Sequence, residues 1–248
     1  MKESRASWQE RYKDLFYDRS RGFIDGTAEF HRMCRDAIPK NARILEIGAG
    51  PSNPSSRFLA TMGELYGVDV DEEVKGNDAL KEAHVISGDS YPFKDAFFDA
   101  ALSNYVLEHV SDPRAHLQEV FRVLKPGGVY LFRTPNRYHY VALISAYTPH
   151  WVHVLLANRL RGLDPASHEP YPTLYRLNSR ADVRRHALEA GFRVEELRMV
   201  EKEPSYGMAS RLLFFPFMAY ERVVNASEKL GDLRANIFAL LRKSGDRE

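Results

Sequence analysis

The chain has 248 residues, a length that suits one α/β domain with insertions or one domain with a small cap. Its formal net charge of +1 and its scattered basic residues argue against nucleic-acid binding. A single cysteine, Cys34, excludes an intramolecular disulfide and a cysteine-based zinc site. Because the N-terminus lacks a signal-peptide core and no apolar run is long enough to span a bilayer, we expect a cytoplasmic protein.

The first 40 residues are expected to form a helical preface. Aromatic and aliphatic side chains between residues 8 and 16 share one helical face, and residues 28–38 form a second helix that Pro39 ends. Two interpretations stay open for this segment. It packs over the main sheet, or it acts as a lid that lines a substrate pocket.

From residue 43 the chain alternates apolar runs with helical segments, which predicts a parallel sheet with helices on both faces. The first run, residues 43–47, ends in Gly48-Ala49-Gly50, where a ligand can approach the backbone closely. A helix is expected to start near Pro54, and its first amides would face the same ligand. Strand, glycine turn and helix together predict a nucleotide-type site.

Two further residues narrow the choice of ligand. The dinucleotide fingerprint needs a third glycine where this chain has Asn53, so NAD is disfavoured. A second apolar run, residues 64–69, ends on Asp69, at the distance where an acid that holds ribose hydroxyls is expected.

The remaining elements continue the alternation of strands and helices. The expected ones are a helix at 72–80, strands at 84–87 and 98–103, a helix at 113–124, a strand at 129–134, two short helices divided by Pro149, a helix at 179–190 and a strand at 192–200. The tail is expected to be helical around Pro216, with a final amphipathic helix over residues 230–241.

Five motifs occur in order along residues 43–135. They read E-I-G-A-G, Y-G-V-D, S-G-D-S-Y-P-F, F-F-D-A-A-L-S-N-Y-V-L-E-H-V and V-F-R-V-L-K-P-G-G. This block resembles the class I S-adenosylmethionine (SAM) dependent methyltransferases, in particular the small-molecule branch that includes the ubiquinone-biosynthesis enzymes. The resemblance implies an α/β, Rossmann-like and mostly parallel sheet, and SAM as the cofactor, with S-adenosyl-L-homocysteine (SAH) as its product.

The residue patterns and the resemblance together divide the chain into five expected segments. The segments are an N-terminal helical segment at 1–40, a SAM-binding core at 41–136, an acceptor cap insertion at 137–178, the remainder of the core at 179–200 and a hydrophobic, helical C-terminal extension at 201–248.

Cofactor-binding residues follow from the matched motifs. They are Glu46, Gly48, Ala49, Gly50, Asp69, Val70, Asp89, Ser90 and Asn104. The resemblance assigns Asp69 to the ribose hydroxyls and Asp89 to the adenine amino group, with Tyr91 or Phe93 as an apolar wall. Glu46 either holds the substrate amine or braces the loop, and Asp89 could instead be a turn residue after Gly88.

A methyl transfer to a hydroxyl requires a base that takes its proton, and histidine suits that role near neutral pH. His109 follows the strand at 98–103, at the sheet edge where open α/β folds bind ligands, and is the first candidate. His139, between two tyrosines, is the second. For either one, the alternative is a structural role.

Metal dependence is not expected. Some quinone-pathway relatives carry Glu-x-x-Glu-His in this segment, a pattern that can hold a divalent metal. This chain retains Glu108-His109 and has Tyr105 in place of the first glutamate, which leaves too few ligands.

The acceptor is expected to bind the apolar cap and tail. We expect O-methylation of a hydroxyl on a small, lipid-linked or glycan-linked acceptor, with N- or C-methylation or a non-catalytic SAM-binding protein as alternatives. The apolar tail segment at 212–218 packs as core or as a homodimer face, or it contacts a membrane surface.

Overall fold

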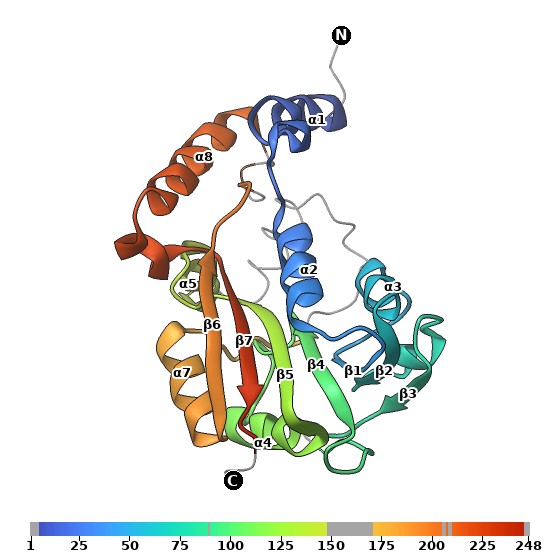
Figure 1. Cartoon of the computed structure of the whole chain (residues 1–248). Coiled ribbons are helices and arrows are strands. Elements are labelled where there is room, and N and C mark those ends of the chain that lie inside the picture. Colours follow the sequence, from blue (N-terminus) through green and yellow to red (C-terminus); the bar gives the residue numbers. More distant parts are fainter. Residues whose placement is uncertain (1–4, 89, 148–170, 205–206, 208–209, 246–248) are drawn as a thin grey trace. The chain divides into compact units, whose positions relative to one another are not determined.

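The computed structural model describes residues 5–88, 90–147, 171–204, 207 and 210–245 (Figure 1). The chain divides into two compact units. The helical unit consists of Met1–Glu29, Tyr138–Pro170 and Val200–Ala235, and the sheet unit consists of Phe30–Arg137, Tyr171–Met199 and Asn236–Glu248.

The sheet unit contains a seven-stranded sheet in the order β3-β2-β1-β4-β5-β7-β6 (Figure 1). β1 pairs in parallel with both β2 and β4, and β7 pairs antiparallel to β5. The strands are β1 Ala42–Ile47, β2 Gly63–Asp69, β3 Glu82–Val85, β4 Phe98–Asn104, β5 Leu124–Pro135, β6 Phe192–Val200 and β7 Asn236–Lys243. The predicted α/β, Rossmann-like class is confirmed.

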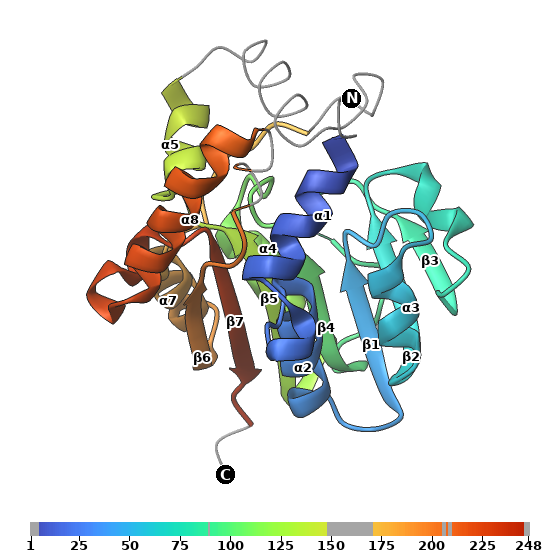
Figure 2. The ribbon, with the colours of Figure 1, turned by 90° about the horizontal axis from the view of Figure 1, so that it is seen from above.

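Helices cover both faces of this sheet (Figure 2). The helices of one face are α2 Gly26–Ala37 and α3 Pro54–Ala60. The helices of the other face are α4 Pro113–Val123 and α7 Arg180–Glu189. The part of α2 from Phe30 onward belongs to the sheet unit. Pro at the first helical position and an Asp or Asn cap start both α3 and α4, as expected of helix N-termini.

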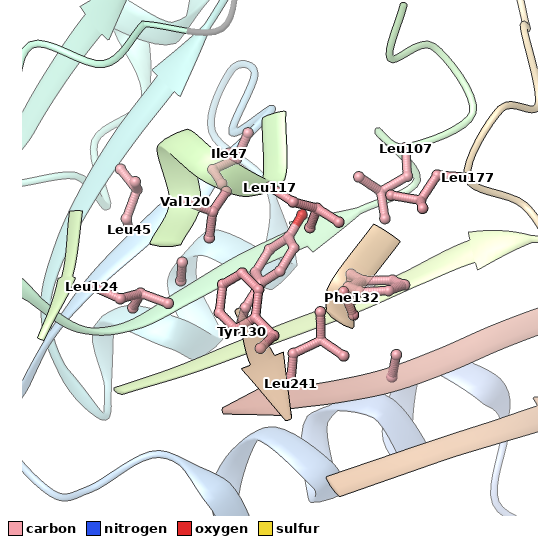
Figure 3. Close-up of a cluster of buried hydrophobic side chains, with 14 of the residues drawn as sticks. Leu45, Ile47, Leu107, Leu117, Val120, Leu124, Tyr130, Phe132, Leu177 and Leu241 are labelled. Atoms are coloured by element: carbon pink, nitrogen blue, oxygen red, sulfur yellow. The ribbon is translucent and has the colours of Figure 1, made fainter. Parts of the chain in front are cut away.

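A cluster of buried apolar side chains joins the sheet to α4 and α7 (Figure 3). Leu45 and Ile47 of β1 belong to it, together with Tyr130 and Phe132 of β5. Successive strand residues point to opposite faces, so one position separates Leu45 from Ile47 and Tyr130 from Phe132.

The C-terminal strand corrects one prediction. Residues 230–241 were expected to form an amphipathic helix, but β7 lies between β5 and β6 in the sheet and the short 3₁₀ helix η4, Glu228–Leu233, precedes it. Ile237 and Leu241 face the α4–α7 cluster, while the ring of Phe238 contacts Phe30 of α2. A strand buried on both faces shows no polar alternation, so periodicity does not separate it from a buried helix.

The segment after β2 also differs from the prediction. A helix was expected at 72–80, but the chain forms a short 3₁₀ helix, η2 Glu72–Gly76, which Asn77 ends. The side chain of Asn77 donates to the carbonyl oxygen of Gly50 at 3.2 Å. Asn77 therefore ends the short helix and bonds to the glycine turn.

The strand order places a ligand site at the carboxyl end of β1. The chain passes from β1 through α3 to β2 on one side, and the later strands β4 and β5 lie on the other side of β1. Open α/β sheets bind ligands where the strand order reverses in this way.

The helical unit has a small aromatic core of its own. Its elements are α1 Arg5–Phe16, η1 Arg19–Arg21, α5 Tyr140–Tyr147, α8 Arg211–Asn225 and η4. Trp8, Tyr17 and Phe214 form the buried cluster. The helix expected around Pro216 is confirmed, because α8 contains this residue. The second short helix expected after Pro149 lies outside the described residues. Within the part of the chain that is described, no helix is long and apolar enough to cross a membrane.

Candidate functional site

The glycine turn after β1 uses both of its glycines. Gly48 and Gly50 have φ angles of 72° and 56°, in the left-handed region that favours glycine. A Cβ at Gly48 would lie 2.3 Å from the Val106 side chain, whereas a Cβ at Gly50 would meet no described heavy atom within 4 Å. Gly48 therefore permits close packing on the loop after β4, and Gly50 leaves an open face that a ligand can occupy.

The start of α3 contradicts one expectation about this turn. The Asn53 side chain accepts hydrogen bonds from the amides of Ser55 and Ser56 at 2.9 and 3.0 Å, and Pro54 has no amide hydrogen. Asn53 also donates to the carbonyl oxygen of Ala49 at 2.9 Å. The prediction that the first amides of α3 face the ligand is wrong for Ser55 and Ser56, because the Asn53 side chain accepts from both.

Glu46 lies beneath the turn and braces it. Its carboxyl is buried and accepts a hydrogen bond from the Ser56 hydroxyl at 2.7 Å. Asn77 also donates to the Ser56 hydroxyl, at 3.1 Å. Burial, together with the carboxylate of Asp69, raises the pKa of Glu46 to about 7. The sequence did not single out Ser56 or Asn77, because their role depends on contacts between segments distant in the chain.

Asp69 lies at the end of β2 and is oriented by two backbone amides. One carboxylate oxygen accepts from the amide of Gly50 at 2.8 Å and the other from the amide of Asp71 at 3.0 Å. A carboxylate has about four acceptor positions, so each oxygen keeps one for a further donor. The two neighbouring hydroxyls of a ribose could each donate to one of these carboxylate oxygens. Val70 and Ser90 are exposed near these strand ends, and Asp89 lies outside the described residues.

Of the two aromatic residues predicted as a wall of the site, Tyr91 is buried elsewhere, and the role of Phe93 stays a prediction. Tyr91 is buried in the core, where its hydroxyl lies 3.4 Å from Nδ1 of His116 and its amide donates to Glu119. Phe93 packs against the rings of Phe97 and Phe98. Tyr91 therefore packs in the core, whereas Phe93 is only partly buried against it.

The loop after β4 has a constrained backbone. Tyr105 has a φ of 59°, which is unfavourable for a bulky side chain, and its hydroxyl donates to Asn236 at 3.0 Å. Its amide donates to the carbonyl oxygen of Arg133, and the Arg133 guanidinium donates to the side chain of Asn104. Constrained residues of this kind cluster at ligand sites. Asn104 is thus held at the end of β4, beside the switch point.

His109 has a defined ring orientation in this loop. Its Nδ1 lies 3.0 Å from the carbonyl oxygen of Pro172. A carbonyl oxygen can only accept, so Nδ1 carries the hydrogen and the neutral ring keeps its basic lone pair on Nε2. The preceding residue, Glu108, is buried and accepts from the Thr134 hydroxyl at 3.1 Å, and burial raises its pKa. The arrangement leaves Nε2 of His109 as a proton acceptor.

His139 belongs to the helical unit and has a different environment. It is 4% exposed, and burial lowers its pKa to about 4. Its Nε2 lies 3.5 Å from Glu201, whose own pKa burial raises to about 8. Burial therefore favours the neutral form of both groups. The structure places the two candidate bases in different units.

The described residues contain no group of three or more His, Cys, Asp or Glu side chains that could hold a metal ion. Glu108 is engaged by Thr134 and His109 by Pro172. Independence from a metal stays a prediction.

Residues 45–132 match the family model described as a methyltransferase domain. The ubiquinone/menaquinone biosynthesis C-methyltransferase UbiE of Edwardsiella ictaluri is 28% identical over 131 residues, which cover 48% of this chain and 52% of that protein. The uncharacterized methyltransferase C1B3.06c of Schizosaccharomyces pombe is 27% identical over 214 residues, which cover 79% of this chain and 72% of that protein. The chain thus spans about half the length of the UbiE relatives it matches.

Solved structures share the fold. The S-adenosylmethionine dependent methyltransferase from Mesorhizobium loti superposes with a TM-score of 0.54 at 14% identity, covering 88% of this chain and 98% of that chain. A likeness at this identity shows the fold, and the family match covers the strands that carry the glycine turn and Asp69.

Proposed function

We propose that this chain, whose residues 45–132 match a methyltransferase domain model, is a class I methyltransferase that transfers a methyl group from SAM to a small-molecule acceptor. The observation that supports the proposal most is the pairing of Asp69 with the glycine turn. The carboxylate accepts from the Gly50 amide at 2.8 Å, so the ribose-binding acid and the open face at Gly50 form one rigid arrangement.

The residues at the end of β1 and β2 fit the parts of SAM. Gly50 leaves room for the ligand against the backbone, and Asp69 has acceptor positions for both ribose hydroxyls. Glu46, with its pKa near 7, supports the turn and can ionise when a cationic amine binds nearby. SAM itself supplies an electrophilic methyl group on a sulfonium. The chain supplies binding and alignment, which can account for most of the rate enhancement of such a transfer.

His109 is the residue that we assign to the acceptor. Its Nε2 is available to take a proton from an acceptor hydroxyl, because the Pro172 carbonyl fixes Nδ1 as the protonated nitrogen. For a phenol or quinol, loss of that proton activates the oxygen and the adjacent ring carbon alike. We propose O-methylation. C-methylation is the second candidate, because the UbiE relatives are named C-methyltransferases.

The product distinguishes the two outcomes. Transfer of a ¹³C-labelled methyl group to a quinol or phenol acceptor gives a methoxy carbon in the first case and a ring-methyl carbon in the second, which differ clearly by NMR. Incorporation into nitrogen, or binding of SAM without any turnover against a cell extract, would contradict the O-methylation proposal.

The acceptor is proposed to be apolar and lipid-linked, or carried on a glycan lipid. One face of α8 exposes Leu212, Pro216, Ala219 and Val223, spaced as one stripe of a helix. Arg222 is exposed beside this stripe. An apolar stripe bordered by arginine suits the surface of an anionic membrane, so we propose peripheral membrane contact through α8. The acceptor cap, residues 137–178, is part of the same proposal, although 148–170 lie outside the described residues.

Vesicle binding tests the α8 face. Wild type should co-sediment with anionic phospholipid vesicles, and Leu212→Asp with Val223→Asp should abolish this. Leu188→Asp, on an exposed leucine of α7, is the matched control and should bind as wild type does. If the double variant changes the oligomeric state and leaves vesicle binding unaltered, the stripe is a homodimer face and the membrane proposal is wrong.

Calorimetry tests the cofactor. Wild type should bind SAM and not NAD. Asp69→Ala should weaken SAM by about 1.5–3 kcal/mol, the range for a hydrogen bond to a charged group. Asp36→Ala, which removes a carboxylate from an exposed ion pair in α2, should leave the affinity unchanged. Binding of NAD without binding of SAM would overturn the proposed function.

A further inference from the structure

A short segment of the sheet unit is fixed across the loop that carries His109. We call residues 171–176 the strap. The amides of Leu174 and Tyr175 both donate to the carbonyl oxygen of Glu108, at 2.6 and 3.2 Å. The Arg176 guanidinium donates to the carbonyl oxygen of Ser111 at 2.6 Å. The strap has no regular secondary structure, yet these bonds to backbone carbonyls fix its position on the loop after β4.

Tyr171, the first residue of the strap, contacts the loops that follow two different strands. The ring of Tyr171 meets that of His109 edge to face, with 6.1 Å between centroids. Its hydroxyl lies 3.5 Å from a carboxylate oxygen of Asp71, in the loop after β2. Because β1 lies between β2 and β4 in the sheet, a side chain that contacts both of these loops crosses the end of β1. The glycine turn is located there.

Tyr171 has the properties of a ligand contact rather than of a core residue. The side chain is 52% exposed although its ring edge and hydroxyl both have neighbours. Desolvation and the carboxylates of Asp71 and Asp69 raise the pKa of the phenol, so it remains a hydrogen-bond donor through the neutral range. A large, half-exposed aromatic that contacts the loops after β4 and β2 offers apolar area and one polar tip.

We propose that Tyr171 is a further cofactor-binding residue, which covers the ribosyl part of SAM between Asp69 and His109. The inference rests on the proposed function. The same strap fixes the tautomer of His109, because the carbonyl oxygen of Pro172 accepts from Nδ1. One six-residue segment would thus contact the nucleoside of SAM and orient the proposed catalytic base, His109. No family motif found in the sequence includes this segment.

Calorimetric binding of SAH, the stable product, tests the assignment without any requirement for turnover. Tyr171→Ala should weaken SAH by about tenfold, the loss expected of one aromatic contact and its polar tip. Tyr171→Phe keeps the ring and should stay within about threefold of wild type. Leu174→Ala is the matched control, because it shortens another half-exposed side chain of the strap and leaves the backbone bonds in place. It should bind SAH as wild type does.

A second ligand separates the parts of the nucleoside. 5′-Methylthioadenosine has the ribose and adenine of SAH and lacks its amino-acid portion, so Tyr171→Ala should weaken both ligands by the same factor. A loss confined to SAH would overturn the ribosyl assignment. Equal SAH affinity for Tyr171→Ala and Leu174→Ala, in a wild type that binds SAH, would overturn the inference and leave the proposed function intact. A wild-type chain that binds neither SAM nor SAH overturns both.

Discussion

The sheet unit and the helical unit each contain one of the histidines that the sequence marked as a candidate base, and their environments differ. His109 is half-buried, and its Nδ1 lies 3.0 Å from the carbonyl oxygen of Pro172, to which it donates. His139 is 4% exposed, and its Nε2 has no hydrogen-bond partner among the described residues, with Glu201 3.5 Å away. Residue type alone therefore does not decide which histidine can exchange a proton with a ligand.

The comparison shows what a catalytic base needs beyond an imidazole. His109 has an orienting acceptor and retains an accessible nitrogen, the arrangement found in bases that act on bound substrates. His139 lies beside a carboxyl whose pKa burial raises to about 8, and burial lowers the pKa of the imidazole to about 4. We infer that His109 acts on the acceptor and that His139 belongs to the packing of the helical unit.

Replacement of His109 should have the largest effect. His109→Ala should lower kcat by about 10²–10⁴-fold, the contribution of a positioned general base, with the SAM dissociation constant unchanged. The measurement is turnover with labelled SAM, alongside calorimetry of SAM binding. His186→Ala, on α7, serves as the control and should turn over as wild type does. If His109→Ala retained full turnover while His139→Ala lost it, the two histidines would exchange roles.

The cofactor end of the sheet was predictable because its signals are local. A strand, two glycines and an acid at the end of the next strand specify backbone geometry within a short stretch, and β1, the turn and Asp69 lie where the sequence placed them. Local sequence did not reveal Ser56 and Asn77, whose bonds to Glu46 and Gly50 join different elements of the fold.

Non-local packing explains the other failures. β7 is flanked by β5 and β6, and its run of buried residues is equally compatible with a helix until its strand partners are known. The sequence did not predict the burial of Glu201, because a glutamate after a strand is usually exposed. Here folding buries it beside His139 and Glu221, and both its protonation and that of His139 follow from that burial.

Replacement of Glu201 should have the next largest effect, which is on the pH dependence of the unfolding free energy. Its folded pKa of about 8 is above the ordinary value of 4.5, so between these values the folded state holds a proton that the unfolded state has released. Stability is therefore lost as pH rises from about 4.5 to about 8. Glu201→Gln removes this loss. Relative to the variant, wild type should lose about 2–4 kcal/mol of unfolding free energy between pH 5 and pH 9, measured by urea denaturation.

Glu195 provides the matched control for that experiment. It lies on β6, and the hydrogen bond from Arg242 holds its pKa below the ordinary value. It is therefore ionised in both states above pH 5, and the stability difference between Glu195→Gln and wild type should stay constant from pH 5 to pH 9. A flat difference for Glu201→Gln as well would mean that Glu201 is ionised in the folded chain, and the neutral contact with His139 would be wrong.

His139 should give the smallest effect, at the acid end. Its folded pKa of about 4 is below the ordinary 6.5, so the unfolded state binds a proton first as pH falls. Wild type should lose about 1–3 kcal/mol of unfolding free energy relative to His139→Leu between pH 6.5 and pH 4, by urea denaturation at each pH. His84→Leu, at a more exposed histidine of β3, is the control for replacing an imidazole by leucine. An equal acid dependence in His139→Leu and wild type would show that His139 is accessible to protons in the folded state, and the distinction from His109 would then depend on the turnover measurements alone.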